Sequence, residues 1–352
     1  MSVSAAVKIR GRWVGPGHPV YIIAEAGVNH NGDLATACRL VDVAAEAGAD
    51  AVKFQTFKAE NLATLTAPKA NYQRSTTDPA ESQLQMLRGL ELSAAQFGEL
   101  RDYCHECDIE FLSTPFDEAS ADLLEALDVP AYKVPSGEIT NLGLLCHIAG
   151  KARPLILSTG MATLAEVETA LDTASAAGNG EVILLHCVSS YPAPPNEANL
   201  RAMQTLTRAF RVPVGFSDHT LGLEVALAAV ALGACVVEKH FTLDRTLPGP
   251  DHAASLTPLE LRQLVAAIRN VEAALGDGCK RPTPSEADTR MVARKSVTLL
   301  ADLEEGRVLE PFMLGLRRPG NGIAPAEMGR VVGRRLSTGA MAGTTLTWEM
   351  LT

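Results

Sequence analysis

Two stretches in the second half of the chain decide its fold: Pro213-Val-Gly-Phe-Ser-Asp-His219 and Val236-Val-Glu-Lys-His240. Each begins apolar and β-branched, ends on a histidine and is followed by a helical pattern, which is typical of a β/α repeat. The ends of parallel strands in such a repeat converge on one face, where active sites lie. Two imidazoles from adjacent strand ends would be close enough to share one divalent metal ion. The competing interpretation is a pair of hydrogen-bonded core histidines.

The number of strand-like runs indicates the architecture. Eight short β-type runs occur along the chain: Tyr21–Glu25, Ala51–Gln55, Glu110–Thr114, Ala131–Pro135, Pro154–Ser158, Val182–His186, Val214–Ser217 and Val236–His240. Helical periods separate them, such as Leu34–Ala47, Ala119–Leu127, Leu164–Ala177 and Leu221–Leu232. Eight strands alternating with helices over about 280 residues match a (β/α)8 TIM barrel in both count and length. A doubly wound open sheet rarely needs eight successive parallel units, so the sequence predicts the barrel.

The last part of the chain has a different character. A stretch rich in glycine and proline, from Gly276 to Ser285, follows the helical pattern Pro258–Leu275 and is typical of a linker. Beyond it the runs are short and interrupted by turns. We therefore predict a barrel domain over residues 1–280, a linker over 281–295 and a small domain over 296–352. A domain of roughly 60 residues is at the lower limit for a core of its own, so we expect it to rest on a partner surface.

Composition favours a cytoplasmic enzyme. The chain is 47% hydrophobic and 20% charged, which suits a large folded core. It has no apolar run of the roughly 20 residues that a membrane helix needs, and no signal-type segment. A formal charge of −10 argues against nucleic acid as a partner. The seven cysteines are scattered, and Cys104-His-Glu-Cys107 is a lone CxxC without a second pair, so free thiols in a reducing compartment are expected.

The other strand ends carry polar side chains that suit chemistry on an anion. Lys53 and Gln55 alternate on the second strand, so both point to the same side. The candidate residues at the remaining strand ends are Glu25, Lys133, Ser136, Glu138, Ser158 and Tyr191. Lysines together with hydroxyl groups can bind a phosphate without a P-loop. A metal with nearby carboxylates indicates carbonyl activation and proton transfer.

Seven motifs in this order resemble the sialic acid synthase family. They are Glu25-Ala-Gly-Val-Asn-His-Asn-Gly32, Val52-Lys-Phe-Gln-Thr56, Lys133-Val-Pro-Ser-Gly-Glu138, Ser158-Thr-Gly-Met-Ala162, Gly215-Phe-Ser-Asp-His-Thr220, Glu238-Lys-His-Phe-Thr242 and Arg317-Arg-Pro-Gly-Asn-Gly322. The resemblance covers Tyr21 to Leu351, and the tail is similar to the family's antifreeze-like (SAF, β-clip) domain. It implies condensation of phosphoenolpyruvate with an N-acetylated aldohexose, with release of phosphate and a nine-carbon keto acid. It also implies a domain-swapped homodimer, in which each small domain caps the partner's barrel.

The resemblance assigns a role to each candidate residue. His219 and His240 would hold Mn2+ or Mg2+. The phosphate and carboxylate of phosphoenolpyruvate would be bound by Lys53, Lys133, Thr114, Ser136, Ser158 and Ser217. Glu25 and Asp251 would contact sugar hydroxyls, and Gln55 and Tyr191 would belong to the pocket wall. Glu138 would assist proton transfer with the attacking water, and Arg318 would reach the N-acetyl group from the other subunit.

The acceptor sugar is predicted to be N-acetylmannosamine, which makes the chain an N-acetylneuraminate synthase. Legionaminate and pseudaminate synthases, which use diacetamido-trideoxy sugars, are the alternatives. The segment Ala67-Pro-Lys-Ala-Asn-Tyr-Gln73 resembles both N-acetylneuraminate and legionaminate synthases, and Ser189 and Ser190 depart from the family's usual residues. Two further alternatives are a Schiff-base aldolase with Lys133 as nucleophile and a non-catalytic protein that binds ice or glycans through its tail. Borohydride trapping would identify the first, and the tail's many arginines argue against the second.

Overall fold

The computed structural model describes residues 6–352, and the chain divides into two compact units after Gly276. The predicted domain boundary at residue 1 lies outside the described residues. Residues 281–295, predicted as a linker, contain a 3-10 turn over Pro284–Glu286 and the short helix α12 (Ala287–Ala293). Among the helices of residues 6–352, none is both long and apolar enough to cross a membrane.

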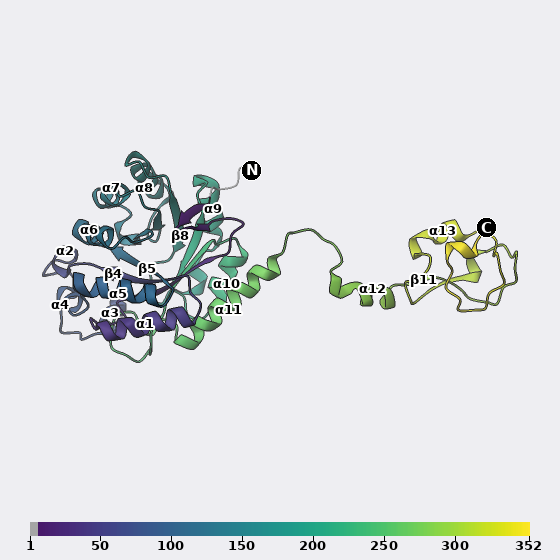
Figure 1. Ribbon diagram of the computed structural model, residues 1–352, viewed down its shortest axis with the longest axis horizontal. Coiled ribbons are helices and arrows are strands. Elements are labelled where there is room, and N and C mark those ends of the chain that lie inside the picture. The colour runs from purple at the N-terminus through teal and green to yellow at the C-terminus, as the bar shows by residue number, and fades with distance from the viewer. Residues whose placement is uncertain (1–5) are drawn as a thin grey trace. The chain divides into compact units, whose positions relative to one another are not determined.

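The first unit is a barrel of eight parallel strands (Figure 1). The strands are β3 (Tyr21–Gly27), β4 (Ala51–Thr56), β5 (Glu110–Pro115), β6 (Tyr132–Val134), β7 (Leu155–Ser158), β8 (Val182–Cys187), β9 (Val214–Asp218) and β10 (Val236–His240). They are ordered β5-β4-β3-β10-β9-β8-β7-β6, and β5 also packs beside β6, so the sheet curls round on itself. All eight predicted strands are present, and the predicted fold class is confirmed.

Helices cover the outside of this barrel (Figure 1). They are α1 (Leu34–Glu46), α5 (Ala94–Glu106), α6 (Glu118–Ala126), α7 (Leu142–Ala149), α8 (Leu164–Ala176), α9 (Arg201–Phe210), α10 (Glu224–Ala231) and α11 (Pro258–Leu275). Polar caps start several of them: the side chain of Asp33 accepts a hydrogen bond at the start of α1, and Thr163 forms a capping box with Glu166 in α8. The helix predicted from Leu221 begins only at Glu224, because Gly222 has a φ of 78° and cannot lie in a helix.

The side chains that face the inside of the barrel form two layers, one apolar and one polar. The residues that face inward near the start of the strands are apolar and form one buried cluster, which includes Tyr21, Ile23, Ile156 and Ile183. On most strands the next inward residue toward the carboxyl end is polar; these residues include Glu25, Lys53, Thr114, Lys133, Ser158 and Glu238. Because side chains alternate along a strand, the polar layer lies above the apolar one at the carboxyl end of the barrel.

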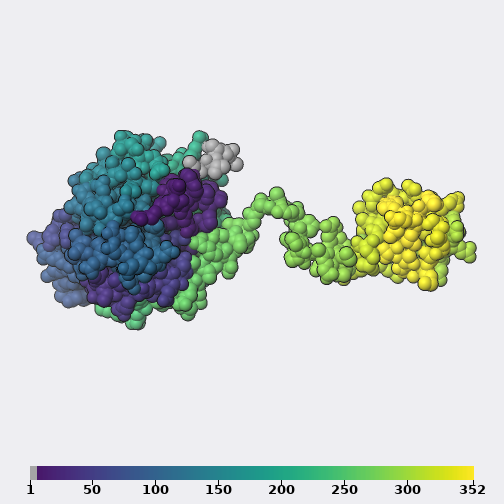
Figure 2. Space-filling model, viewed as in Figure 1, coloured from purple at the N-terminus to yellow at the C-terminus, as the bar shows by residue number. Residues whose placement is uncertain are grey.

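A hairpin that the sequence did not predict packs against the apolar layer. Its strands are β1 (Val7–Ile9) and β2 (Arg12–Val14), which pair in antiparallel fashion. Val7, Ile9 and Val14 belong to the same buried cluster as the apolar layer, so the hairpin closes the amino-terminal end of the barrel. In Figure 2 this dark purple N-terminal segment is seen on the surface of the barrel unit.

Residues 59–92, between β4 and α5, form an additional segment beside the carboxyl end of the barrel. It contains the short helices α2 (Ala59–Leu62), α3 (Asn71–Thr76) and α4 (Gln83–Arg88). The buried ammonium group of Lys69 holds the segment together, because it donates to Thr77 Oγ1 at 2.9 Å and to Glu81 Oε1 at 3.1 Å. The backbone N–H of Gly249 donates to the carbonyl oxygen of Thr76 at 3.3 Å, which ties α3 to the loop that follows β10.

The second unit, from Asp277 to Thr352, is small and largely irregular. Strands β11 (Ser296–Leu299) and β12 (Leu314–Arg317) pair in antiparallel fashion, and the one-turn helix α13 (Met328–Val331) packs nearby. Its own core consists of aliphatic side chains: Val297, Leu299, Leu309, Leu314, Ile323, Val331, Leu336 and Leu346.

Candidate active site

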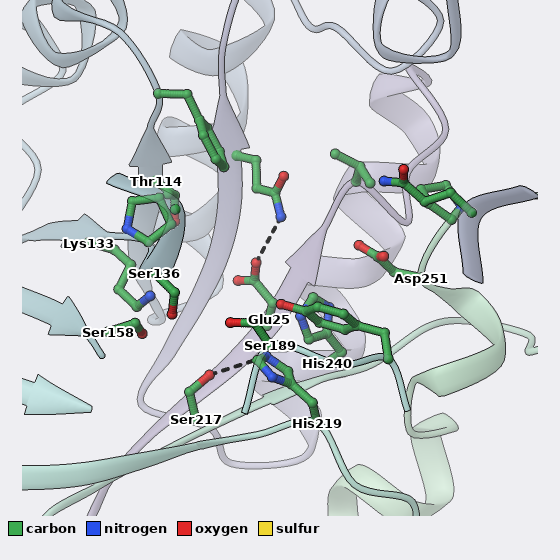
Figure 3. A pocket seen from close by; sticks show the side chains of 18 of the residues that line it. Glu25, Thr114, Lys133, Ser136, Ser158, Ser189, Ser217, His219, His240 and Asp251 are labelled. Atoms are coloured by element: carbon green, nitrogen blue, oxygen red, sulfur yellow. Dashed lines mark hydrogen bonds between the residues drawn. The ribbon is translucent and has the colours of Figure 1, made fainter. Parts of the chain in front are cut away.

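A pocket of about 360 Å3 opens at the carboxyl end of the barrel (Figure 3). Twelve of the fourteen candidate residues line it: Glu25, Lys53, Gln55, Thr114, Lys133, Ser136, Ser158, Tyr191, Ser217, His219, His240 and Asp251. They come from strands far apart in the sequence, and the barrel brings them together as the predicted alternation requires. Figure 3 shows Lys133, Ser136 and Ser158 on one side of the two histidines and Asp251 on the other.

The lysine end of the pocket, defined as Lys53, Lys133, Ser136, Ser158 and Ser217, is tied together by buried ion pairs. The ammonium group of Lys53 lies 2.6 Å from a carboxylate oxygen of Glu25 and 3.6 Å from one of Glu238. Lys133 lies 3.6 Å from the other oxygen of Glu238, and the Ser217 hydroxyl donates to that oxygen at 2.8 Å. Glu238 is thus the centre of the network.

Glu238 is not among the residues predicted from the sequence, although its position on β10 offers a signal. Glu238 stands two residues before His240 on β10, so both side chains point into the barrel. Lys239 between them points outward and pairs with Asp218 at 2.6 Å. Since Ser217 and His219 follow the same alternation around Asp218, the outward pair links the two strands that carry the histidines.

Burial and the nearby lysines shift the pKa values of Glu25 and Glu238 in opposite directions. Burial raises the pKa of Glu25 to about 7, even though Lys53 lowers it. Burial also opposes ionisation of Glu238, but Lys133 and Lys53 outweigh it and lower the pKa of Glu238 to about 2. At neutral pH, Glu238 is therefore a fixed anion, while Glu25 can hold or release a proton.

The two histidines form a suitable metal site. Their ring centroids lie 5.5 Å apart, and burial lowers the pKa of both imidazoles, so they are neutral and able to act as ligands. His219 Nδ1 lies 2.7 Å from the carbonyl oxygen of Val188, which leaves Nε2 for a metal. His240 Nδ1 is buried and has no hydrogen-bond partner among the described residues.

The number of protein ligands is typical of an open site. Within residues 6–352, no group of three or more His, Cys, Asp or Glu side chains is arranged to hold a metal. An ion held by His219 and His240 would therefore keep positions for water and substrate, as catalytic metals do and structural ones do not. The residues present fit a catalytic divalent ion.

Two hydroxyl groups, those of Ser136 and Ser158, lie beside Lys133 (Figure 3). The Ser136 hydroxyl accepts a hydrogen bond from the backbone N–H of Gly160 at 3.0 Å, and the buried Ser158 hydroxyl has no partner among the described residues. A Cβ on Gly160 would lie 2.3 Å from Ser189 Oγ and 2.7 Å from Ser136 Oγ, so only glycine lets the backbone approach this closely. Hydroxyl groups beside lysines suit a phosphate or carboxylate.

The Asp251 end of the pocket, defined as Gln55, Tyr72, Tyr191 and Asp251, has few internal partners. Gln55 donates to Glu25 at 3.4 Å, and the rings of Tyr72 and Tyr191 lie 5.1 Å apart. Burial raises the pKa of Asp251 to about 6. Tyr72 was not predicted, because it belongs to α3 in the additional segment and not to a strand end.

Two candidate residues lie elsewhere. Glu138 is absent from the residues that line the pocket, and its carboxylate accepts a hydrogen bond from Asn141 Nδ2 at 2.8 Å, at the start of α7. Its part in proton transfer stays a prediction. Arg318 belongs to the second unit, where it is exposed and its Nε donates to the carbonyl oxygen of Ala293 at 2.9 Å. Its role across subunits stays a prediction.

The fold and pocket together are typical of one class of enzyme: a (β/α)8 barrel with buried lysines and a pair of neutral imidazoles at the carboxyl ends of its strands. Comparison with known proteins narrows this class. Residues 40–280 match the model of the NeuB family, and residues 294–352 match that of the SAF domain. The chain belongs to the NeuB family, the sialic acid synthases, and is an enzyme of the type that joins phosphoenolpyruvate to a sugar by a carbon–carbon bond.

Individual relatives cover nearly the whole chain. The chain is 52% identical to the N,N'-diacetyllegionaminic acid synthase of Legionella pneumophila, over 94% of each protein. It is 50% identical to the enzyme of the same name from Campylobacter jejuni, over 89% of this chain and 94% of that protein. A crystal structure of the N-acetylneuraminic acid synthetase of Leptospira borgpetersenii has a TM-score of 0.72 at 37% identity, and the match covers 81% of this chain and 95% of that one.

Proposed function

We propose that the protein is an N,N'-diacetyllegionaminate synthase, which condenses phosphoenolpyruvate with a diacetamido-trideoxy aldohexose and water. The two relatives that are 52% and 50% identical both carry this name. These names support the diacetamido-trideoxy sugar, the alternative acceptor predicted from the sequence, better than N-acetylmannosamine, which was the first prediction. Both acceptors share one chemistry, so the rest of the predicted reaction is unchanged.

The observation that carries this proposal is the division of one pocket into a lysine end and an Asp251 end with the histidines between them. Lys53, Lys133 and the hydroxyl groups beside them would hold the phosphate and carboxylate of phosphoenolpyruvate. The sugar would occupy the Asp251 end, with its aldehyde toward the histidines. This order places C3 of the enol next to the aldehyde carbon.

The chemistry follows from that placement. C3 of phosphoenolpyruvate forms the new bond to the aldehyde carbon, water adds at C2, and phosphate leaves with the bridging oxygen. Glu25, whose pKa is near 7, can exchange a proton with the aldehyde oxygen as its charge develops. With 18O at the bridging position, we expect the label to leave in phosphate.

We propose Mn2+ or Mg2+ as the cofactor, held by His219 and His240. Such an ion would polarise the aldehyde carbonyl of the sugar. The chain's own contribution is to keep both imidazoles neutral by burial and to fix the tautomer of His219 through the carbonyl of Val188.

We further propose a domain-swapped homodimer in which Arg318 of one subunit completes the Asp251 end of the other. This end lacks a basic side chain of its own, since both lysines of the pocket lie at the opposite end. All seven cysteines are free thiols, which supports a cytoplasmic location.

A phosphate-release assay with phosphoenolpyruvate and a panel of sugars tests the proposal. We expect the highest kcat/KM with 2,4-diacetamido-2,4,6-trideoxymannose, lower values with its diacetamido stereoisomers, and the lowest with N-acetylmannosamine. A preference for N-acetylmannosamine would return the assignment to N-acetylneuraminate synthase. Release of phosphate with no sugar present, or a borohydride-trapped adduct on Lys133, would contradict the proposed chemistry.

A further inference from the structure

One side of the active-site pocket is apolar, which is unusual for a site that must bind a polar sugar. We call this surface the apolar wall; it consists of Val28, Leu62, Met86, Leu87, Leu90 and Phe116. Val28, Met86 and Leu90 are buried in one cluster with Phe57, and Leu62, Leu87 and Phe116 pack against it while half-exposed. The half-exposed members have surface left to contact a ligand.

The wall shares one segment of the chain with the Asp251 end. Four of its six residues belong to the additional segment 59–92, which also supplies Tyr72 to the Asp251 end. Tyr72 lies against Tyr191, and α3 is hydrogen-bonded to the loop just before Asp251. The additional segment therefore contributes both the wall and one ring of the Asp251 end to the same pocket.

The direction of the sugar follows from the reaction. Its C1 must lie near the histidines and the enol, because the new bond forms there. In an aldohexose C6 is the carbon furthest along the chain from C1, so it reaches deepest into the Asp251 end. The polar groups of that end, including Gln55, Tyr191 and Asp251, can pair with substituents on the carbons between.

We propose that the apolar wall binds the C6 group of the sugar, selects a methyl over a hydroxymethyl group there, and uses Leu62 and Leu87 as its specificity-determining residues. This inference deepens the proposed function and rests on it for the placement of a sugar in the pocket. The wall would leave a C6 hydroxyl without a hydrogen-bond partner, whereas a methyl group loses nothing on leaving water.

The size of the preference can be bounded. An apolar site rejects a ligand that merely adds a hydroxyl by roughly 10- to 100-fold, because the cavity is the right shape and only a hydrogen bond is missing. We expect a ratio of kcat/KM within this range between two sugars that differ only at C6. A larger ratio would need a steric block.

Four mannose-configured 2-acetamido sugars separate this inference from the proposed function. They carry either an acetamido or a hydroxyl group at C4, and either a methyl or a hydroxymethyl group at C6. Phosphate release tests C4 and C6 independently, and calorimetric binding repeats the C6 comparison without turnover. If the C4 hydroxyl sugars are preferred and C6 methyl is still favoured, the proposed function is wrong and the wall is correctly assigned. If C6 makes no difference in either measurement, the wall assignment is wrong whatever the result at C4.

Variants then locate the preference. Leu62→Asn and Leu87→Asn offer the C6 hydroxyl a partner, so we expect the C6 ratio to fall by about tenfold through a changed KM for the sugar. Leu65→Asn is the matched control, since Leu65 lies in the same segment, is 79% exposed and does not line the pocket. Its C6 ratio should equal that of the unaltered protein. An unchanged ratio in both folded wall variants would overturn the role of these residues, and the comparison of sugars on the unaltered protein needs no variant at all.

Discussion

The lysine end and the Asp251 end of the pocket differ in how their polar groups are supported. At the lysine end, strand residues neutralise one another: Glu238 lies between Lys53 and Lys133 and accepts a hydrogen bond from Ser217. At the Asp251 end, loop and segment residues project with few partners, and the carboxyl pKa of Asp251 is raised by burial alone. A rigid, charge-balanced end suits a substrate that every turnover shares, while an end built from loops can vary with the sugar.

The largest effect is expected where the two ends meet. His240→Ala removes one of the two imidazoles, and loss of a metal that stabilises charge by several kcal/mol should lower kcat by about 1,000-fold or more. Dialysis against EDTA should abolish turnover of the unaltered protein, and Mn2+ should restore it. Metal content, measured by atomic emission, should fall with activity.

The exposed His105 provides the control for this experiment. His105→Ala should keep both its metal content and its rate, because the residue lies on α5 outside the pocket. A His240→Ala protein with full rate and full metal content would show that the histidine pair is structural.

The next effect tests the charge balance of the lysine end. Glu238→Gln leaves the buried ammonium groups of Lys53 and Lys133 with one carboxylate fewer, and breaking a buried pair costs about 3–5 kcal/mol of unfolding free energy. Chemical denaturation at pH 7 measures this loss. The exposed pair Glu60–Arg88 is the control, and Glu60→Gln should leave the denaturation midpoint nearly unchanged.

The contribution of the Glu238 carboxylate to the free energy of unfolding should decrease as the pH falls. Because the folded protein holds the pKa of Glu238 at about 2, below its ordinary 4.5, the carboxylate contributes stability above pH 4.5 that is lost as the pH falls toward 2. The unaltered protein should lose this increment over that range, and Glu238→Gln should not. Equal acid sensitivity of the two proteins would mean that the network is weaker than its geometry implies.

A third effect asks whether the Asp251 end is complete within one chain. Losing a hydrogen bond from a charged group costs about 1.5–3 kcal/mol, so Arg318→Ala should raise the KM for the sugar by about 10- to 150-fold and leave that for phosphoenolpyruvate nearly unchanged. Arg317→Ala, at the exposed neighbouring position, should change neither. These KM values test whether Arg318 contacts the sugar, and they do not test whether it comes from the other subunit.

Mixed subunits test the swap. In a swapped heterodimer of Arg318→Ala and His219→Ala chains, one site carries both defects and the other carries neither. Activity should therefore reappear after subunit exchange. If exchange is demonstrated with tagged subunits and no activity returns, each site is made within a single chain.

The difference between strand residues and residues of loops or the additional segment also explains what the sequence could predict. Strand residues obey a period of two, so one inward residue near a strand end identifies its neighbours, and eight of the candidate residues that line the pocket belong to strands. Glu238 followed this rule and could have been found from His240. The period does not extend to the 3-10 turn Ser136–Glu138, where Ser136 lines the pocket and Glu138 does not.

Residues that depend on tertiary packing could not be predicted in this way. Tyr72 and Leu87 lie in short helices of the additional segment, and only the packing of that segment brings them to the pocket. The hairpin of β1 and β2 was missed because strands of three residues are too short to show alternation.

The smallest expected effect is that of Asp251→Asn, which should weaken sugar binding and stabilise the folded protein. Asp251→Asn keeps a polar side chain of the same size, so the KM for the sugar should rise only by about tenfold, the cost of one altered hydrogen bond. The free energy of unfolding at neutral pH should increase in the same variant. Folding raises the pKa of Asp251 from 3.8 to about 6, so the folded state disfavours the ionised form, and this cost is absent below about pH 3.8 and complete above about pH 6.

The cost corresponds to about 3 kcal/mol at most, which Asp251→Asn would remove at pH 7. We therefore expect the variant to unfold at a higher denaturant concentration than the unaltered protein at pH 7, and at a similar one near pH 4. Asp244→Asn is the control, because Asp244 lies outside the pocket and hydrogen bonds from Thr246 lower its pKa; this substitution should not stabilise the protein. If Asp251→Asn weakened both folding and sugar binding at pH 7, Asp251 would be a structural residue of its loop, and the Asp251 end would be as internally supported as the lysine end.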